Sequence, residues 1–245
     1  MNILIIGATS AVATAYARLQ AEKESNLYLL GRSEDKLKKI QLDLKARGAS
    51  KVELAIADFS DTQQHAEVIS NAFKAFGRID TVLVAHGTLP DQGQCQTNVD
   101  KALAEFHINA TSTFSLLSHI ANEMEQHKTG TLAVITSVAA DRGRSSNYIY
   151  GSAKAAVSTF VEGLRGRLFK SNIHVLEIKP GFIDTPMTQD LDLPSLLLST
   201  PEQIASIIDK AIRKKKHCIY APFYWWFILT IIKSIPRGIF KKLSI

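Results

Sequence analysis

Short runs of apolar residues alternate along the chain with longer stretches in which apolar positions recur every three or four residues. The first pattern is typical of buried strands and the second of helices with one buried face. We therefore expect six helices over residues 12–23, 34–47, 62–76, 98–127, 149–170 and 201–213. The expected strands are Asn2–Ile6, Leu27–Leu30, Val52–Ala57, Thr81–Val84, Thr131–Thr136, His174–Ile178 and a weaker Cys218–Tyr220.

Three of these strands, around residues 3–6, 82–85 and 132–135, are almost continuously apolar. This indicates burial on both faces, as in a parallel sheet covered by helices. Strands and helices in alternation form right-handed βαβ units. The pattern thus predicts an α/β protein with a Rossmann-like, doubly wound parallel sheet of about seven strands. A chain of 245 residues suits one such domain, with residues 1–217 as the domain and 218–245 as a tail.

The composition, 46% hydrophobic and 21% charged, is that of a globular protein. The two cysteines, Cys95 and Cys218, are far apart and lack the spacing of metal ligands, so we expect reduced thiols, a cytoplasmic location and no metal site. The apolar start runs straight into a glycine turn, which indicates a first strand rather than a signal peptide.

A glycine turn follows the first strand, in the run Gly7-Ala8-Thr9-Ser10-Ala11-Val12. A tight strand-to-helix turn brings backbone N–H groups and the helix dipole against a pyrophosphate. Taken alone the turn is weak evidence, because many strand–turn–helix units share it. The residues that we expect to contact a dinucleotide here are Gly7, Thr9, Ser10, Ala11 and Val12.

The second strand ends in Gly31-Arg32-Ser33, with no acidic residue to accept a hydrogen bond from a ribose 2′-hydroxyl. A guanidinium at this point suits a 2′-phosphate, so Arg32 favours NADP(H) over NAD(H). The alternative is a solvated arginine at a helix start.

The strongest chemical signal is Ser137 followed by Tyr150-Gly151-Ser152-Ala153-Lys154. Tyr150 and Lys154 are four residues apart and share one face of a helix. Hydride addition to a carbonyl leaves an alkoxide that needs a proton, and tyrosine has a pKa of about 10. We expect the Lys154 ammonium to lower the Tyr150 pKa and Ser137 to orient the substrate oxygen. An amphipathic helix that merely contains a tyrosine and a lysine is the alternative.

These motifs, in this order, resemble the short-chain dehydrogenase/reductase family over about residues 1–215. The resemblance implies carbonyl reduction by Ser137, Tyr150 and Lys154, with Tyr150 and Lys154 also contacting the cofactor. It implies that Asn109 holds a water that links the lysine to solvent. It further implies a homo-oligomer, built through the long helices that carry Asn109 and Tyr150.

The resemblance also assigns the rest of the cofactor site. It places the adenine against Asp58-Phe59, where Asp58 is alternatively a helix cap. Two departures concern this side: alanines replace two glycines at 11 and 13, and Ala85-His86 replaces asparagine-alanine before Gly87. His86 either lines the nicotinamide ribose or is a buried spacer. The further cofactor contacts that the resemblance implies are Ala85, Gly87, Pro180, Ile183 and Thr185.

The end of the chain is basic and aromatic. From Lys210 onward there are nine Lys or Arg and no Asp or Glu, whereas residues 1–209 sum to −3. The uncharged stretch Cys218–Ile232 has fifteen residues, fewer than the roughly 20 of a spanning helix. Such a tail suits an anionic membrane surface better than nucleic acid. Three interpretations stay open: an interfacial helix, a lid on the substrate cleft, or an oligomer contact.

Several phrases, among them GATSAVA and IPRGIF, are similar to one subgroup of the family, the reductase half of a decaprenylphosphoryl-ribose 2′-epimerase. The subgroup implies a keto-sugar on a polyprenyl phosphate and a partner oxidase that uses FAD. Arg142 and Arg144 then become candidates to bind the substrate phosphate, with plain loop charges as the alternative.

The leading hypothesis is an NADPH-dependent reductase of a small-molecule or lipid-linked carbonyl, cytoplasmic or peripheral on the inner face of the membrane. A soluble ketoreductase for fatty-acyl or small-molecule ketones is the first alternative. A non-catalytic cofactor-binding module is the second, and the complete Ser/Tyr/Lys/Asn set argues against it.

Overall fold

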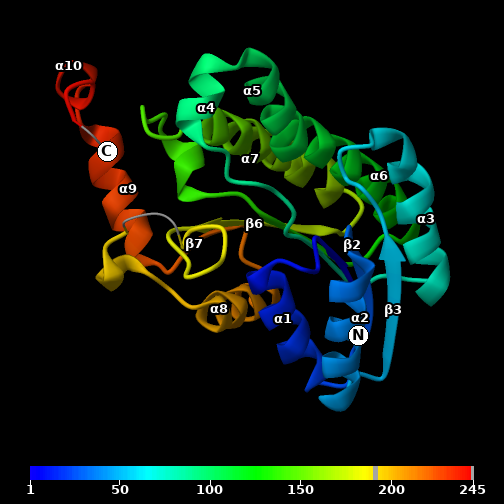
Figure 1. Cartoon of the computed structure of the whole chain (residues 1–245). Coiled ribbons are helices and arrows are strands. Elements are labelled where there is room, and N and C mark those ends of the chain that lie inside the picture. Colours follow the sequence, from blue (N-terminus) through cyan, green and yellow to red (C-terminus); the bar gives the residue numbers. More distant parts are fainter. Residues whose placement is uncertain (190–192, 244–245) are drawn as a thin grey trace.

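The protein forms a single seven-stranded parallel sheet, in a computed structural model that describes residues 1–189 and 193–243 (Figure 1). The spatial order of the strands is β3-β2-β1-β4-β5-β6-β7, and all six pairings are parallel. The predicted Rossmann-like fold is thus confirmed. The strands are β1 (Asn2–Ile6), β2 (Asn26–Gly31), β3 (Lys51–Ile56), β4 (Thr81–Val84), β5 (Thr131–Ile135), β6 (His174–Pro180) and β7 (Cys218–Ala221).

The strand order reverses between β1 and β4, since the chain runs outward from β1 to β3 and then returns to the other side of β1. Beyond the carboxyl ends of the strands, such a reversal leaves a crevice in which ligands of open α/β sheets bind. The loops after β1, β4 and β5 all leave from this edge, so the glycine turn, His86-Gly87 and Ser137 come to the same end of the sheet.

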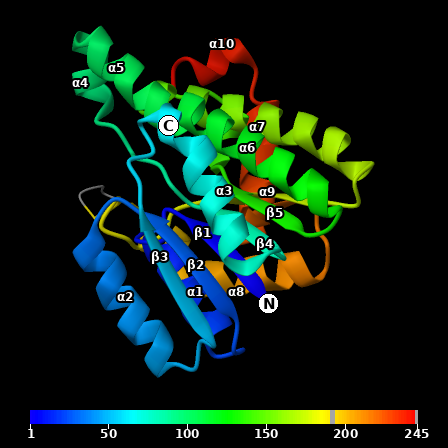
Figure 2. The same ribbon diagram turned by 90° about the vertical axis from the view of Figure 1, so that its right-hand side faces the viewer.

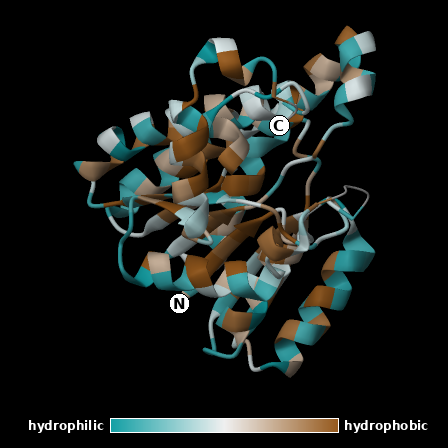
Figure 3. Cartoon of the chain, turned by 90° about the vertical axis from the view of Figure 1, so that its left-hand side faces the viewer, coloured by the Kyte–Doolittle hydropathy of each residue, from teal (hydrophilic) through white to brown (hydrophobic). Residues whose placement is uncertain are grey.

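Helices cover both faces of the sheet (Figures 1 and 2). One apolar cluster lies between the sheet and α1, α2 and α8, and a second lies between the sheet and α3, α6 and α7. The central strands are therefore largely hydrophobic, as the middle of Figure 3 shows. These helices are α1 (Ala11–Ala21), α2 (Glu34–Ala46), α3 (His65–Phe76), α6 (Ser112–His127), α7 (Tyr148–Phe169) and α8 (Pro201–Arg213), with short 3-10 turns at η1 (Thr62–Gln64), η3 (Val138–Asp141) and η4 (Ser195–Leu197).

The long helix expected over 98–127 is interrupted by a π-helical turn. It consists of α5 (Val99–Phe106), the π turn η2 (His107–Thr111) and α6. Such turns insert an extra residue into a helix and are frequent at functional sites. The loop expected before it also contains a short helix, α4 (Gln92–Thr97).

The segment predicted as a tail begins inside the sheet, because β7 pairs with β6 from Glu177↔Cys218 to Pro180↔Ala221. The chain then forms α9 (Tyr224–Ser234) and the short α10 (Arg237–Phe240), at one side of the molecule (Figure 1). Trp225 and Leu229 of α9 are buried in a third apolar cluster with Val138. Within residues 1–189 and 193–243, no helix has the length and hydropathy needed to cross a bilayer.

Candidate functional site

The three residues with the strongest chemical signal come together at the carboxyl edge of the sheet. Tyr150 and Lys154 lie in the first turns of α7, and the Lys154 Nζ is 5.6 Å from the centroid of the Tyr150 ring. Ser137 is the second residue after β5, and its hydroxyl lies close enough to Tyr150 to lower the pKa of the phenol. The spacing in sequence therefore corresponds to contact in space.

Ser137 is held by the turn that it begins. Its backbone is extended, and its Oγ accepts a hydrogen bond from the Ala139 N–H at 3.0 Å. The turn η3 packs directly on the start of α7, where a Cβ on Gly151 would lie 3.0 Å from the Ala139 carbonyl oxygen. Glycine at 151 thus allows α7 to approach close enough for Tyr150 to reach Ser137.

The pKa values differ from the expected pattern. Burial raises the pKa of Tyr150 to about 12, and the hydrogen bond from Ser137 only partly opposes this rise. Burial also lowers the pKa of Lys154 to about 8. The expected lowering of the Tyr150 pKa is therefore wrong for this structure, because removal from water penalises both charged forms. A protonated tyrosine at neutral pH is a proton donor, which is the form that reduction of a carbonyl requires.

Asn109 is buried in the π turn and is bound on all sides. Its Oδ1 accepts from the Thr88 N–H at 3.0 Å, and its Nδ2 donates to the Thr88 Oγ1 and the Glu105 carbonyl. A Cβ on Gly87 would lie 2.9 Å from Asn109 Oδ1 and 3.2 Å from Lys154 Nζ. Asn109, Gly87 and Lys154 therefore adjoin one another, and Thr88 is a supporting residue that the sequence did not reveal.

Gly7 is required by the backbone at the turn after β1. Its φ is +76°, and a Cβ there would lie 2.7 Å from the His86 backbone nitrogen. Ser10 caps α1 by accepting from the Ala13 N–H, so Ala11 and Val12 occupy the first helical positions, whose N–H groups have no partner within the helix. No positive φ falls on the alanines, so their replacement of glycine is compatible with the turn.

Arg32 lies exposed just past β2, one residue from Gly31, whose Cα adjoins the Thr9 side chain. Asp58 lies near enough to Arg32 to be affected by its charge. The Asp58 carboxylate accepts from the Ser60 N–H and hydroxyl, and these bonds lower its pKa. Asp58 therefore acts as a turn cap, and this role is compatible with a ligand beside it.

His86 is buried and packs on Phe59, with 5.3 Å between the ring centroids. Its Nε2 is 3.2 Å from the Thr113 hydroxyl, whereas its Nδ1 has no hydrogen-bond partner among the described residues. Burial lowers the pKa of His86 to about 3, so the ring is neutral. The ring thus fills space beside Phe59 with one nitrogen bonded and one unpaired.

The loop after β6 is covered by the tail. A Cβ on Gly181 would collide with the Trp225 indole, whose Nε1 lies 1.8 Å from that position. Ile183, two residues on, forms a bridge with Ser199, and Thr185 contacts Thr188. The loop that begins at Pro180 therefore lies between the sheet edge and α9, a position in keeping with the lid among the three interpretations of the tail.

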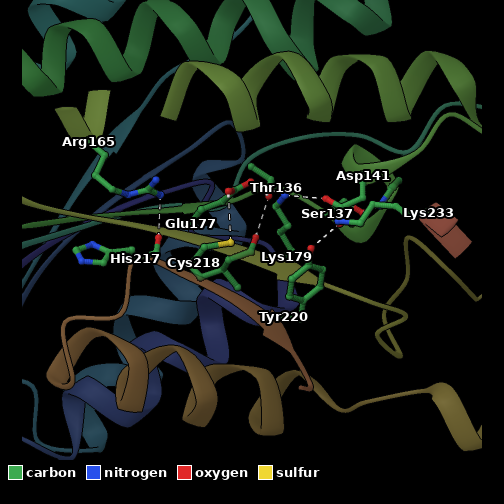
Figure 4. Close-up of polar contacts among 12 residues, drawn as sticks. Thr136, Ser137, Asp141, Arg165, Glu177, Lys179, His217, Cys218, Tyr220 and Lys233 are labelled. Carbon is green, nitrogen blue, oxygen red and sulfur yellow. Dashed lines mark hydrogen bonds and ion pairs between the residues drawn. The ribbon is translucent and has the colours of Figure 1, made fainter. Parts of the chain in front are cut away.

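Asp141 is the centre of a buried polar network (Figure 4). Its carboxylate accepts from Lys179 at 2.7 Å, from the Tyr220 hydroxyl at 2.5 Å and from Lys233 of α9 at 3.2 Å. Burial opposes its charge, but these hydrogen bonds prevail and the pKa of Asp141 lies below its ordinary value. The turn that follows Ser137 is thereby tied to β6, β7 and the tail.

Arg142 and Arg144 have different environments. The Arg142 guanidinium donates to the carbonyls of Ile232 and Ile235 and lies 3.7 Å from the centroid of the Phe240 ring. It therefore fastens the tail, and its hydrogen-bonding capacity is largely used. The Arg144 side chain is buried, and two of its nitrogens have no hydrogen-bond partner in the described part of the chain.

No group of three or more His, Cys, Asp or Glu that could hold a metal ion occurs within residues 1–189 and 193–243. Both cysteines are free thiols, with Cys95 buried and Cys218 exposed.

Comparison with known proteins identifies the family of this chain. The model of the short chain dehydrogenase family matches residues 1–194. The chain belongs to the short-chain dehydrogenase/reductase family. It is 30% identical over 241 residues to an uncharacterized oxidoreductase of Mycobacterium tuberculosis. The aligned residues make up 98% of this chain and 96% of the relative. An uncharacterized oxidoreductase of Streptomyces coelicolor is also 30% identical, over 100% of this chain and 96% of its own.

The fold agrees with solved members of the family. A short-chain dehydrogenase from Sphingobium yanoikuyae in complex with NADPH superposes with a TM-score of 0.84, over 97% of this chain and 98% of its own, at 22% identity. At that identity the likeness concerns the fold alone. Family membership makes the protein an oxidoreductase, and the enzyme class predicted from the sequence is confirmed.

Proposed function

We propose that the protein is an NADPH-dependent reductase that delivers a hydride to a carbonyl. The observation that carries the proposal is the contact of Ser137, Tyr150 and Lys154 at the carboxyl edge of the sheet, beside Asn109 and Gly87. In this arrangement Ser137 donates a hydrogen bond to the carbonyl oxygen and Tyr150 gives it a proton. Lys154 and Asn109 then return a proton to Tyr150 from solvent.

A dinucleotide fits the cofactor end of the sheet. The absence of a Cβ at Gly7, the free helix-start amides of Ala11 and Val12, and the hydroxyls of Thr9 and Ser10 suit a pyrophosphate. NADPH, when bound, supplies the hydride. The remaining residues proposed to contact it are Asp58, Phe59, Ala85, His86, Gly87, Tyr150, Lys154, Pro180, Ile183 and Thr185.

Two observations favour NADPH over NADH. Arg32 presents an exposed guanidinium past β2, and its neighbours in the chain, Gly31 and Ser33, offer no carboxylate that could accept a hydrogen bond from a ribose hydroxyl. The structural neighbour from Sphingobium yanoikuyae has NADPH bound. A guanidinium binds a phosphate through two parallel hydrogen bonds, which a ribose hydroxyl cannot reproduce.

The test is NADPH oxidation with a panel of ketones and aldehydes, followed by absorbance, for the wild type and Tyr150→Phe. The variant removes the proton donor and keeps the ring, so we expect the rate to fall by about 10²- to 10⁴-fold with cofactor binding retained. Tyr148→Phe, on the exposed first residue of α7, is the matched control and keeps its rate. Equal rates for Tyr150→Phe and the wild type would rule out the mechanism.

The substrate that we propose is hydrophobic or lipid-linked, with a lipid-borne keto-sugar as the specific candidate. The tail supports this, because α9 covers the loop after β6 and packs on Val138, the residue after Ser137. Phe182, Trp225 and Leu197 thus form an apolar wall beside η3, the turn after Ser137, which we call the catalytic turn. A reductase of small soluble ketones would not need a wall of this kind.

The outer side of the same helix suits an anionic membrane surface. Phe223, Trp226, Phe227 and Ile231 are between 43% and 67% exposed, although all four are large and apolar. A groove of about 640 Å³ lies where the tail crosses the catalytic turn, and Lys233, Arg237 and Lys241 are among its lining residues. Aromatic residues and cations at one surface are typical of a peripheral membrane contact.

Vesicle co-sedimentation tests this contact, with phosphatidylcholine vesicles that either contain or lack phosphatidylglycerol. We expect the wild type to bind the anionic vesicles, and Trp226→Ser/Phe227→Ser to bind at least about fivefold less. Phe169→Ser, which removes another exposed aromatic at the end of α7, is the control. Equal sedimentation of all three proteins would exclude a membrane role for α9.

Two partner proposals rest on the family and the subgroup. Self-association through α5 and α7 is favoured by Val99 and Leu103, which are 68% and 63% exposed on one side of α5. Light scattering of the wild type and Leu103→Glu tests it, and a monomeric wild type excludes it. An oxidase partner that uses FAD rests on the subgroup resemblance, and a coupled assay with such an oxidase tests it.

A further inference from the structure

Four polar side-chain atoms near the catalytic turn are buried without a hydrogen-bond partner among the described residues. They are Nε and Nη2 of Arg144, Nε2 of Gln92 and Oδ1 of Asn147. Buried polar atoms are nearly always bonded in folded proteins, so each exception requires an explanation. Arg144 is the residue that most requires an explanation, since only 7% of it is exposed.

Arg144 and Asn147 belong to one short stretch of the chain, and Gln92 of α4 contacts the end of that stretch. The Asn147 N–H donates to the Arg144 carbonyl at 3.2 Å, and the Ile149 N–H donates to the Gln92 Oε1 at 3.1 Å. The stretch connects η3 to α7, so Ser137 lies seven residues before Arg144 and Tyr150 six residues after it. The unpaired atoms of Arg144 and Asn147 thus lie in the segment between the two reacting side chains, and Gln92 contacts this segment from α4.

The charge of Arg144 is not balanced by the neighbouring acid. Asp141 is the acid that acts on the Arg144 pKa, which burial lowers. The Asp141 carboxylate already accepts from Lys179, Tyr220 and Lys233, and within residues 1–189 and 193–243 the Arg144 Nε and Nη2 have no hydrogen-bond partner. A buried guanidinium without a bonded anion is unfavourable, and an anionic ligand at this point would remove the penalty.

We infer that Arg144 is the receptor for an anionic group of the substrate, a phosphate or a carboxylate. The inference rests on the proposed function, because the anion would be carried by the molecule whose carbonyl meets Tyr150. Nε and Nη2 are the edge of a guanidinium that binds two oxygens of one anion. The Gln92 amide supplies a further donor at the same stretch. Arg142 does not share this role, because the tail carbonyls occupy its guanidinium.

Arg144 sets the class of substrate rather than the rate of the chemical step. A ketone with a phosphate or carboxylate would pair with the buried guanidinium, whereas a neutral ketone would leave it unpaired. Because the unpaired group is the costly one, the site discriminates against neutral ligands.

The experiment measures binding of three probes to the full chain with NADPH present: farnesyl phosphate, farnesol and inorganic phosphate. Calorimetry and the thermal midpoint are followed for the wild type, Arg144→Met and Arg144→Lys. The control is Arg165→Met, because the Arg165 guanidinium, unlike that of Arg144, is bonded to backbone carbonyls and lies further along α7. We expect farnesyl phosphate to bind the wild type and Arg165→Met roughly 10- to 100-fold more tightly than Arg144→Met, with Arg144→Lys between them.

The probes also identify the source of the anion. Farnesyl phosphate binding that far exceeds that of inorganic phosphate supports a lipid-linked substrate. Inorganic phosphate binding of similar strength, again lost in Arg144→Met, supports a soluble phosphorylated substrate at the same site. The inference is overturned if Arg144→Met binds the anions as the wild type does, or if none of the anions binds the wild type.

Failure of the inference is distinguishable from failure of the proposed function. Reduction of a neutral test ketone depends on Tyr150, so we expect Arg165→Met, whose arginine has no part in the site, to retain that rate and Tyr150→Phe to lose it. A loss of the neutral-ketone rate in both Arg144→Met and Arg144→Lys would show that Arg144 is needed to maintain the structure of the catalytic turn. That result would overturn the inference that Arg144 binds an anion of the substrate. A Tyr150→Phe variant with full rate overturns the proposed function alone.

Discussion

The two sides of the catalytic set are built in different ways. The side that we propose for the cofactor uses backbone turns at the ends of β1, β2 and β4, where Gly7 and Gly87 are small and act through local conformation. The side that we propose for the substrate is assembled from the turn after Ser137 and from α9, which is about ninety residues further along the chain. There the decisive contacts are charged groups, above all Asp141 with Lys179 and Lys233. The cofactor side is therefore determined by short-range geometry and the substrate side by long-range pairing.

The largest effect that separates the two sides is expected for Asp141→Asn. The variant keeps the shape and the Tyr220 hydrogen bond but removes the nearer ionic partner of Lys179, which is 12% exposed and keeps only Glu177 at 3.7 Å. Removal of one member of a buried ion pair costs about 3–5 kcal/mol, so we expect a loss of that size in the urea unfolding free energy. NADPH affinity of the remaining folded protein should stay near the wild-type value.

The control for that variant is Asp43→Asn, whose carboxylate pairs with Arg18 and Arg47 at the surface. Exposed pairs are worth about 0–1 kcal/mol, so the loss should be several times smaller. Similar losses in both variants would show that the network around Asp141 does not hold the substrate side together.

A somewhat smaller effect is expected for Gly7→Ala, on the cofactor side. An alanine Cβ would lie 2.7 Å from the His86 backbone nitrogen and would adopt a φ of +76°. We expect a loss of about 2–3 kcal/mol in unfolding free energy and at least a tenfold weaker NADPH complex by fluorescence titration. Gly143→Ala, where a Cβ meets nothing within 4 Å, is the control. If Gly7→Ala bound NADPH as tightly as the wild type, the backbone conformation at Gly7 would not determine cofactor binding.

The pH dependence of stability probes the residue that both sides share. Burial lowers the pKa of Lys154 to about 8, below its unfolded value. Between these values the unfolded chain binds more protons than the folded one, so this lysine makes stability rise with pH. From pH 8 to 10 the wild type should gain about 2–3 kcal/mol relative to Lys154→Met, measured by urea unfolding at each pH. Parallel curves for the two proteins would show that Lys154 is not buried as a neutral group.

The smallest effect concerns the choice of cofactor. Arg32→Ala removes an exposed guanidinium, so the fold should be unaffected. A hydrogen bond to a charged group contributes about 1.5–3 kcal/mol, which predicts roughly 10- to 100-fold weaker NADPH binding with NADH binding unchanged. Titration of both dinucleotides measures this, with Arg78→Ala, which removes an exposed arginine paired with Asp80 at the other end of the sheet, as the control. Equal weakening of both cofactors would remove the assignment of Arg32 to a 2′-phosphate.

Much of the fold was predictable because strands and helices follow from periodicity within each segment. The strand at Thr81–Val84 and the helix from Pro201 to Arg213 have the predicted bounds. The π turn around Asn109 was not predictable, because it depends on hydrogen bonds to Thr88 from another segment. The length of β6 and the start of the tail were shifted for a similar reason: pairing with β7 extends the strand to Pro180.

The sequence by itself determined the catalytic set and the glycine turn, because these motifs depend on spacings of a few residues within one helix or one turn. Only the tertiary structure decided the roles of Arg142 and Arg144, which are the same residue type two positions apart. Arg142 meets carbonyls at Ile232 and Ile235, which the folding of the distant tail brings to it. Arg144 is buried, and its Nε and Nη2 find no such partner in the described part of the chain. Hydrogen-bond partners that come from distant segments leave no pattern in the local sequence, so the structure alone distinguishes the arginine that fastens the tail from the one that remains unpaired.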